Sequence, residues 1–157
     1  MRRLIGSVLV FFLAFPNLCF PWSGKVVGIN DGDTIRVMHR GRETKIRLFG
    51  IDCPERDQAF GNKARSFTSH MAFRKVVEVQ EVDKDSYGRI VAWVSVDGKS
   101  LNKELLRAGL AWWYRYYAEN EHELEKLEAE ARRNKIGLWS APNPIPPWDF
   151  RRSESHR

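Results

Sequence analysis

The sequence "GKVVGINDGDTIRVMHRGRETKIRLFGI", residues 24–51, alternates strand-forming runs with turn residues. It holds three runs rich in β-branched residues, separated by the turn sequence "NDGD" and by a second turn at Gly41. Such runs, with partial alternation of apolar and polar positions, are typical of half-buried strands. Asn, Asp and Gly favour the backbone conformations of tight turns. The stretch therefore predicts three consecutive strands with short connections.

Two more strands and three helices are predicted after this stretch. "KVVEVQEVD", residues 75–83, and "RIVAWVSV", residues 89–96, have strand patterns, whereas residues 61–73, 101–109 and 120–135 have apolar side chains at helical spacing. Asn120 and Glu123 form a capping-box pattern at the start of the last helix. This order of elements favours an α+β fold that is mainly β, a five-stranded OB-type barrel packed with three helices. Such barrels bind oligonucleotides on one face.

The length and composition fit one globular domain, which we place at residues 23–141 of the 157. The hydrophobic share of 43% excludes wholesale disorder, and the net charge of +6 suits a polyanionic partner without requiring one. Apart from the N-terminal leader, the only cysteine is Cys53, which excludes a disulfide framework and a thiolate metal site. Residues 142–157 form a Pro-rich extension and tail, in which we expect "APNPIPPW" to lie extended across the body.

The leader, residues 1–22, has the pattern of a signal peptide. Arg2 and Arg3 precede the apolar run "LIGSVLVFFLAF", and Pro16 follows it. This pattern predicts export, as a secreted or periplasmic protein. A clear small-residue cleavage site is missing, and the apolar stretch approaches the roughly 20 residues that span a bilayer. An uncleaved membrane tether therefore stays open as the alternative.

Carboxylates at two predicted strand ends form a candidate metal site. Asp33 lies in the first turn, and Asp52 and Glu55 follow the third strand. The four histidines are scattered with no pair at ligand spacing, so the donors are hard oxygens that suit Ca2+ or Mg2+ rather than zinc. Two carboxylates with a backbone carbonyl and waters would leave positions open for a phosphate oxygen. A phosphodiesterase site has this requirement.

Two arginines and one glutamate complete the candidate site. Arg47 lies in the strand that leads to Asp52, and Arg89 begins the fifth strand. A guanidinium can bind two phosphate oxygens at once as charge develops in a displacement. Glu55 is the candidate general base for the attacking water. Because Arg47 and Asp52 are an odd number of positions apart, a flat strand would direct them to opposite faces, so we predict a bend at Gly50.

Each of these features also has a simpler structural interpretation. "NDGD" is an ordinary turn sequence, and a glutamate after proline is common at the start of a helix or loop. Arg47 and Arg89 could instead form surface ion pairs with Glu43 and Asp85. Trp112, Trp113 and Tyr114 could be core residues that cover the end of the barrel, or rings on which bases stack.

Several motifs together resemble the staphylococcal (micrococcal) nuclease family. They are "INDGDTIRV", "IRLFGIDCPE", "DSYGRIVAWV", "GKSLNKELLRAGLAWWY" and "LEAEARRNKIGLWS", and the resemblance covers nearly all of residues 24–140. It implies an OB-type barrel with three helices and a monomer. It also implies a Ca2+-dependent endonuclease that hydrolyses phosphodiester bonds of DNA and RNA and leaves 3′-phosphate ends.

The resemblance also assigns roles to residues at matching positions. Asp33 and Asp52 resemble the calcium carboxylates, and Cys53 stands where the family supplies a backbone carbonyl ligand. Arg47 and Arg89 resemble the phosphate-binding arginines, and Glu55 resembles the general base. Of the substrate-contacting positions, Tyr87 and Tyr117 are retained, Arg115 replaces a tyrosine and Ser86 replaces a lysine. The segment after Glu55, "RDQAFGNKA", is shorter than the flexible loop of the type enzyme.

The sequence therefore predicts an exported calcium-dependent endonuclease with little sequence specificity. The alternative is a catalytically weak or inactive nucleic-acid-binding OB-type module, because some barrels of this family have lost their acids and arginines. The intact set of three acids and two arginines argues against that alternative, since clustered carboxylates would repel a polyanion that is only to be bound.

Overall fold

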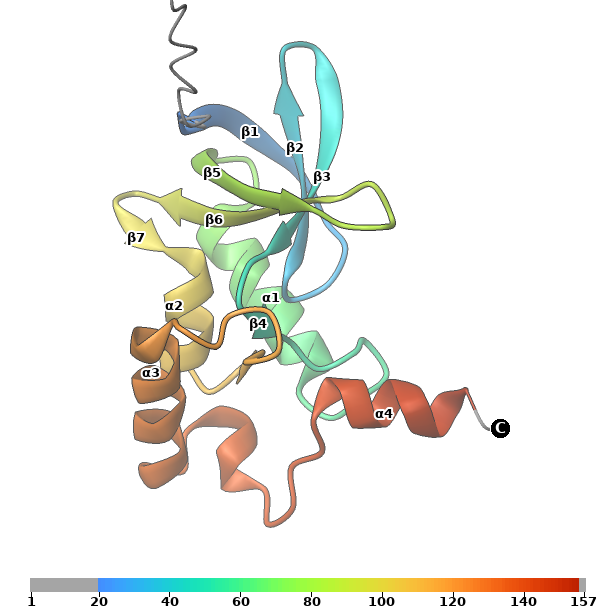
Figure 1. Ribbon diagram of the computed structural model, residues 1–157, viewed down its shortest axis with the longest axis vertical. Helices are drawn as coiled ribbons and strands as arrows, with labels where there is room; N and C mark the ends of the chain where they lie inside the picture. Colours follow the sequence, from blue (N-terminus) through green and yellow to red (C-terminus); the bar gives the residue numbers. More distant parts are fainter. Residues whose placement is uncertain (1–19, 156–157) are drawn as a thin grey trace, which may run out of the picture.

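The computed structural model describes residues 20–155, and its body is a closed five-stranded barrel (Figure 1). The strands are β1 (Trp22–Ile29), β2 (Thr34–His39), β3 (Arg42–Leu48), β5 (Val76–Lys84) and β6 (Ile90–Val96). Neighbours pair in the order β3-β2-β1-β5-β6, and a parallel pairing of β3 with β6 closes the barrel. The predicted OB-type barrel is confirmed.

Alternating side chains of these strands fill the barrel. In the β2–β3 pair, Ile35 lies opposite Ile46, and both are fully buried. Val77 and Val79 of β5 are buried in the same core. Every second residue of a strand points to one face, so the apolar positions of each run meet inside.

Three very short strands extend or flank the barrel. β7 (Lys99–Ser100) pairs with β6. β4 (Ile51–Asp52) and β8 (Trp112–Trp113) form a separate two-stranded sheet, in which Asp52 lies opposite Trp112. This small sheet joins the acidic strand end to the tryptophan-rich segment.

The three predicted helices are present as α1 (Gly61–Ala72), α2 (Leu101–Arg107) and α3 (His122–Arg133), and a short 3-10 helix, η1 (Gly137–Ser140), follows them. The predicted capping box of α3 is wrong. Glu121 is the N-cap residue and makes no side-chain capping hydrogen bond. Glu123 instead accepts a hydrogen bond from Lys103 Nζ at 2.6 Å, which ties α3 to α2.

A fourth helix, α4 (Pro147–Glu154), lies in the tail, and the sequence prediction missed it. The extended conformation predicted for the tail ends at Pro146, whose backbone is extended. Pro147 occupies the first helical position, where a missing N–H has no cost and the fixed φ suits a helix. The start of α4 was therefore missed because it lies in a run of prolines, which are typical of extended segments.

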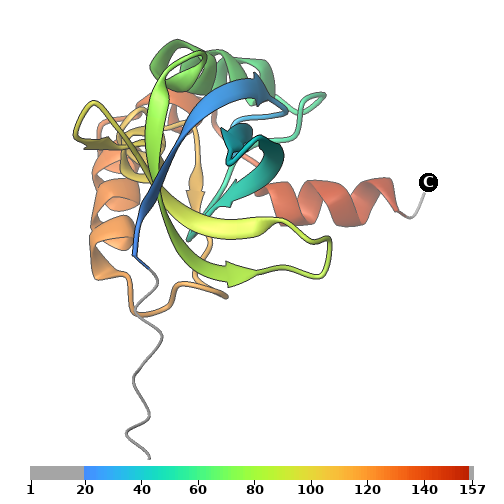
Figure 2. The same ribbon diagram turned by 90° about the horizontal axis from the view of Figure 1, so that it is seen from above.

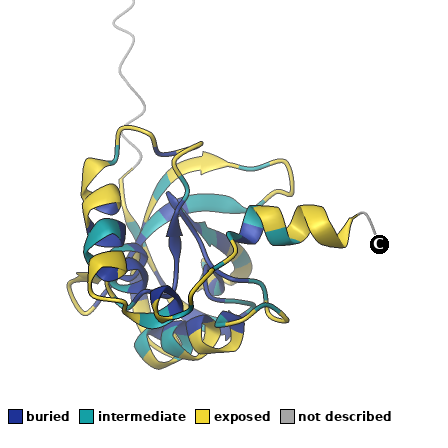
Figure 3. Cartoon of the chain, turned by 90° about the horizontal axis from the view of Figure 1, so that it is seen from below, coloured by how far each residue is buried: buried dark blue, intermediate teal, exposed yellow. Residues whose placement is uncertain are grey.

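Helix α4 leaves the body and points away from the barrel (Figures 1 and 2). Most of its surface is exposed, and its buried residue is Pro147 at its start (Figure 3). Trp148 stacks on Tyr114 with ring centroids 5.4 Å apart. Upstream of the helix, Gln58 Nε2 donates to the Ile145 carbonyl at 2.7 Å. The first turn of α4 is therefore fixed to the body.

The predicted signal peptide falls mostly on residues 1–19, which lie outside the described residues. β1 already begins at Trp22, whose ring Nε1 donates to Glu81 Oε1 at 2.6 Å. Between residues 20 and 155, no helix has the length and apolar character needed to cross a membrane.

Candidate active site

A sharp bend after β3 turns Asp52 back toward Arg47. Gly50 lies in the bend with φ +73°, a conformation that L side chains rarely adopt. The predicted bend is therefore confirmed. Asn102 of α2 holds it in place, because its Nδ2 donates to the Phe49 carbonyl at 2.9 Å. Across the bend, Arg47 Nη2 donates to Asp52 Oδ1 at 2.6 Å.

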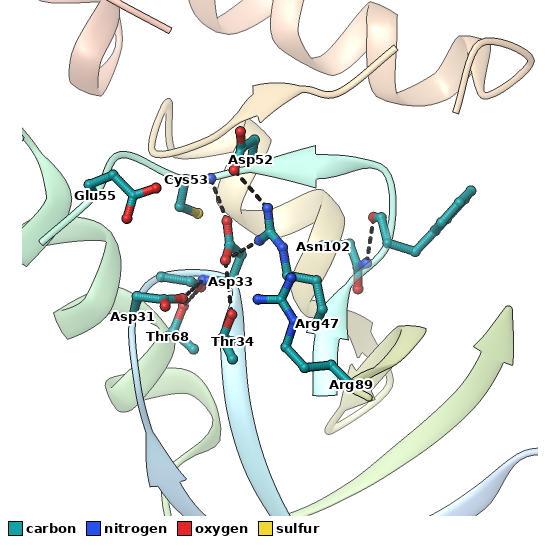
Figure 4. Close-up of polar contacts among 12 residues, drawn as sticks. Asp31, Asp33, Thr34, Arg47, Asp52, Cys53, Glu55, Thr68, Arg89 and Asn102 are labelled. Atoms are coloured by element: carbon teal, nitrogen blue, oxygen red, sulfur yellow. Dashed lines mark hydrogen bonds and ion pairs between the residues drawn. The ribbon is translucent and has the colours of Figure 1, made fainter. Parts of the chain in front are cut away.

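Two buried aspartates share this arginine. Asp33 is 5% exposed and Asp52 is 1% exposed. Arg47 forms an ion pair with Asp33 through Nη1 and with Asp52 through Nη2 (Figure 4). Burial of a charge without a partner is very costly, so the guanidinium stabilises both carboxylates. Since one guanidinium spans both side chains, the two carboxylates of separate strand ends lie close together.

Backbone and side-chain donors fix the orientation of Asp33. Its Oδ2 accepts the backbone N–H of Cys53 at 2.5 Å, and its Oδ1 accepts the Thr34 hydroxyl at 3.3 Å. The turn that carries Asp33 is fixed from α1, where the buried Thr68 hydroxyl donates to the Gly32 carbonyl at 2.5 Å. Sequence reasoning missed Thr68 and Asn102, because a buried polar residue on a helix carries no local pattern that identifies its partner.

Glu55 joins the cluster through an arginine that was not predicted. Arg151 of α4 donates from Nη1 to Glu55 Oε1 at 2.6 Å and from Nη2 to Asp52 Oδ2 at 2.8 Å. Burial by itself lowers the pKa of Arg151, but the hydrogen bonds that Arg151 donates to Asp52 and Glu55, together with their negative charges, outweigh it and raise that pKa. The backbone of Glu55 is packed so tightly that a Cβ on Gly61 would lie 1.7 Å from its carbonyl oxygen.

Arg89 lies on the same face of the barrel wall as Arg47. In the parallel β3–β6 pair Arg47 is opposite Val91, and Arg89 precedes Val91 by two positions. Figure 4 shows its side chain extending toward Arg47.

Arg89 Nε donates to Asp85 Oδ2 at 2.6 Å, so the ion pair with Asp85 that the sequence also allowed is present. The ion pair between Arg47 and Glu43 that the sequence also allowed is wrong, because Glu43 pairs with Arg36 at 3.2 Å.

The predicted substrate residues lie at two places. Tyr87 is exposed, and the Arg89 guanidinium lies 5.4 Å from its ring centroid. Arg115 lies over the ring of Trp113 at 5.0 Å, and Tyr117 contacts the ring of Tyr114 with centroids 5.2 Å apart. Tyr87 therefore lies beside Arg89, whereas Arg115 and Tyr117 belong to the segment that follows β8.

The aromatic segment divides between core and surface. Trp112 and Trp113 are both buried, as the core interpretation of these residues requires. Tyr116 and Tyr117, further along the segment, are exposed. The core interpretation is therefore confirmed for Trp112 and Trp113, and base stacking stays a prediction.

Cys53 is buried, and burial raises the pKa of its thiol well above the usual range. Such a thiol is neutral and unreactive at physiological pH. In the contacts described above it is the backbone of Cys53, through its N–H, that belongs to the site.

The donor set fits a hard divalent cation with open positions. In residues 20–155, no three His, Cys, Asp or Glu side chains are grouped so that they could hold one ion. Asp33 and Asp52 are nonetheless brought within the reach of one guanidinium, and both are oxygen donors. Two carboxylates suit Ca2+ or Mg2+ with its other positions filled by backbone oxygen, water or substrate.

The model of the family described as "staphylococcal nuclease homologue" matches residues 45–141. An uncharacterized endonuclease of Escherichia coli is 41% identical over 152 residues, covering 96% of this chain and 98% of the relative. A micrococcal nuclease of Shigella flexneri is 35% identical over 164 residues, covering 98% of this chain and 94% of the relative. The resemblance seen in the motifs is thereby confirmed, and the chain belongs to the staphylococcal nuclease family of nucleases.

Proposed function

We propose that this protein is a calcium-dependent endonuclease that hydrolyses phosphodiester bonds of DNA and RNA with little sequence preference. The observation that carries the proposal is the bridge from Arg47 to two buried aspartates on separate strand ends. A buried pair of acids with one cation is a costly arrangement for stability alone. It is useful where oxygen ligands for a hard cation and a phosphate-binding guanidinium must lie side by side.

Asp33 and Asp52 would hold the cation, together with the backbone carbonyl of Cys53. When bound, it would polarise a phosphoryl oxygen and neutralise charge that develops on the phosphate. The cluster of Asp33, Arg47 and Asp52 is largely buried, which strengthens electrostatic interactions compared with bulk water.

The remaining side chains have roles that follow from their chemistry. Glu55 accepts a proton from the attacking water as the water oxygen forms its bond to phosphorus. The bond from phosphorus to the 5′-oxygen breaks, the 5′-oxygen takes up a proton from solvent to leave as a hydroxyl, and the phosphate stays on the 3′ side. Arg47 and Arg89 donate to the phosphate oxygens as negative charge builds on them. Tyr87, Arg115 and Tyr117 contact neighbouring nucleotides.

The setting of the protein is part of the same proposal. The leader supports export as a secreted or periplasmic protein, with a membrane tether as the alternative, and the family resemblance supports a monomer. Low sequence preference follows because the groups that would bind substrate here are guanidiniums and tyrosine rings. They recognise phosphates and base faces rather than base edges.

A test uses the purified protein with labelled single-stranded DNA and with RNA, each in Ca2+, in Mg2+ and in chelator. We expect cleavage in Ca2+, none in chelator, and a fall of about a hundredfold or more in Arg89→Ala. Glu55→Gln, which keeps the shape of the side chain, should also lose most of the rate. Undiminished cleavage in chelator would overturn the metal role. Tight binding without cleavage under every condition would favour the binding-module alternative.

A further inference from the structure

Helix α4 brings a third guanidinium to the site from outside the family domain. Arg151 lies ten positions beyond residue 141, where the family match ends. It contacts Glu55 at 2.6 Å and both oxygens of Asp52, at 2.8 and 3.3 Å. Its side chain is 44% exposed, so solvent and ligands can reach it. Arg151 is therefore part of the site because of where it lies, although it is outside the residues that the family model matches.

The charges of the cluster favour a role for Arg151 toward substrate. Three carboxylates, of Asp33, Asp52 and Glu55, meet two guanidiniums, of Arg47 and Arg151. The cluster carries one net negative charge by itself, and one net positive charge once a divalent cation is added. That positive charge matches one phosphodiester. Without Arg151 the loaded cluster would be neutral and would attract a phosphate less.

A groove leads away from Arg151 along α4. Its volume is about 830 Å3, which lies within the usual range for ligand sites. One wall is α4 with Trp148, Arg151 and Arg152, and the other includes the residues of β8 and the segment after it. Because Asp52 pairs with Trp112 of β8, the groove begins next to the carboxylates.

The groove lining is cationic and aromatic. It includes four arginines, Arg115, Arg132, Arg151 and Arg152, and one carboxylate, Glu128. Glu128 pairs with Arg132 at 3.4 Å and accepts the backbone N–H of Trp113 at 3.1 Å, so the charges of Glu128 and Arg132 cancel. The other three arginines have no opposing charge among the residues that line the groove.

Tyr116 lies on the groove with 79% of its surface exposed. Positive charge with exposed aromatic rings is the chemistry that binds the backbone and bases of a nucleic-acid strand.

We propose that the groove beside α4 binds the nucleic-acid strand next to the cleaved phosphodiester, with Arg151 binding a phosphate at its inner end. Arg151 exchanges its carboxylate partners for that phosphate when the strand is bound. This inference rests on the proposed function, because the strand is that of the substrate.

The test measures binding separately from cleavage. A fluorescent single-stranded thymidine 12-mer with phosphorothioate linkages, which resist hydrolysis, is titrated with the full chain by fluorescence anisotropy. The titration is done in Ca2+ and in chelator at several salt concentrations. The variants are Arg151→Gln, Arg151→Lys and, as a matched control, Arg42→Gln in the exposed β2–β3 hairpin. Thermal unfolding of each variant is recorded beside the titrations.

We expect Arg151→Gln to weaken binding in Ca2+ about tenfold and to lower the salt slope by about 0.7. Arg151→Lys should recover part of the affinity, and Arg42→Gln should change it less than about twofold. Unchanged affinity in Arg151→Gln would overturn the inference. Tighter binding would also overturn it, because Arg151 would then exclude the strand.

Failure of the inference is distinguishable from failure of the proposed function. If the wild type cleaves and Arg151→Gln binds the strand with unaltered affinity, the groove proposal fails and the proposed nuclease function stands. If Arg151→Gln binds more weakly but the wild type cleaves nothing with any cation, the proposed nuclease function fails and the groove proposal stands. The same titration with a duplex of that sequence shows whether the groove requires unpaired bases.

Discussion

Arg47 donates to Asp52 at 2.6 Å across a bend, although a flat strand would have placed the two side chains on opposite faces. The bend depends on Gly50, whose φ is +73° and on which a Cβ would lie 2.6 Å from Leu124 Cδ1. The contact between a cation and an acid in the site therefore rests on a glycine and on the packing of α3 behind it.

Gly50→Ala should reduce both stability and activity, because a side chain there meets backbone strain and the Leu124 contact together. Gly98→Ala is the matched control, since φ is +75° at Gly98 but nothing lies within 4 Å of its added Cβ. We expect about 1–2 kcal/mol of destabilisation in Gly98→Ala from strain alone, and more in Gly50→Ala. Urea unfolding and initial cleavage rates check this, and equal losses in the two variants would argue against the packing role.

Asn102→Ala should lower the free energy of unfolding by about 3 kcal/mol, because three backbone groups each lose a hydrogen bond to the Asn102 side chain. The Asn102 side chain accepts from Val94 N at 3.0 Å and donates to the carbonyls of Phe49 and Ala92 at 2.9 and 3.2 Å. Asn62→Ala on the exposed surface of α1 is the control and should change stability by less than about 0.5 kcal/mol. Similar urea midpoints for the two variants would contradict the assigned role.

Asp85→Asn should lower the cleavage rate without unfolding the protein, because Asp85 holds the Arg89 guanidinium at 2.6 Å. We expect a loss of about tenfold in kcat/KM. Asp97→Asn serves as control, since Asp97 forms an exposed pair with Lys75 at 2.8 Å. An unaltered rate in Asp85→Asn would show that Arg89 needs no such support.

The pH dependence of stability gives a second measurement on Asp85. Burial raises the pKa of this carboxyl, but the hydrogen bonds from Arg89 outweigh it and hold the pKa below the ordinary 3.8. The stabilising contribution is therefore complete above pH 3.8 and is lost as the pH falls through the lowered folded pKa. The difference in stability between wild type and Asp85→Asn should shrink at the acid end. A difference that grows on acidification would contradict this sign.

Cys53 should resist alkylation in the folded protein, because its thiol is buried and burial raises its pKa. With Cys19→Ser as background, iodoacetamide should label the protein only at the rate at which it unfolds. Addition of urea past the unfolding midpoint should restore rapid labelling. Mass spectrometry measures the labelling. Rapid labelling of the folded form would contradict the expectation and show that the region around Asp33 opens locally.

Local patterns predicted most of the barrel. The five long strands follow from β-branched runs bounded by turn residues, and the Gly50 bend follows from the odd spacing of Arg47 and Asp52. The capping box of α3 was wrong because Glu123 reaches Lys103 of α2, a contact made only in the folded chain. The sequence around Asn120 does not show that Lys103 competes for the Glu123 carboxylate.

The site was predictable only in part, for the same physical reason. Asp33, Arg47 and Asp52 lie at strand ends that turn chemistry identifies, and the structure brings them together. Arg151 is 99 positions from Asp52, on a helix whose start is hidden among prolines. No periodicity or motif links these positions, so only the folded chain shows the contact.

In the proposed mechanism, Asp33 and Asp52 hold a hard cation that phosphodiester hydrolysis requires. The most direct test compares cleavage of a fluorescent single-stranded DNA by wild type and Asp52→Asn, a variant that keeps the size of the side chain. We expect wild type to cleave in Ca2+ and not in chelator, and Asp52→Asn to be slower by about a hundredfold or more in Ca2+. Equal rates for the two proteins, or equal wild-type rates with and without chelator, would contradict a metal-binding role of the two aspartates.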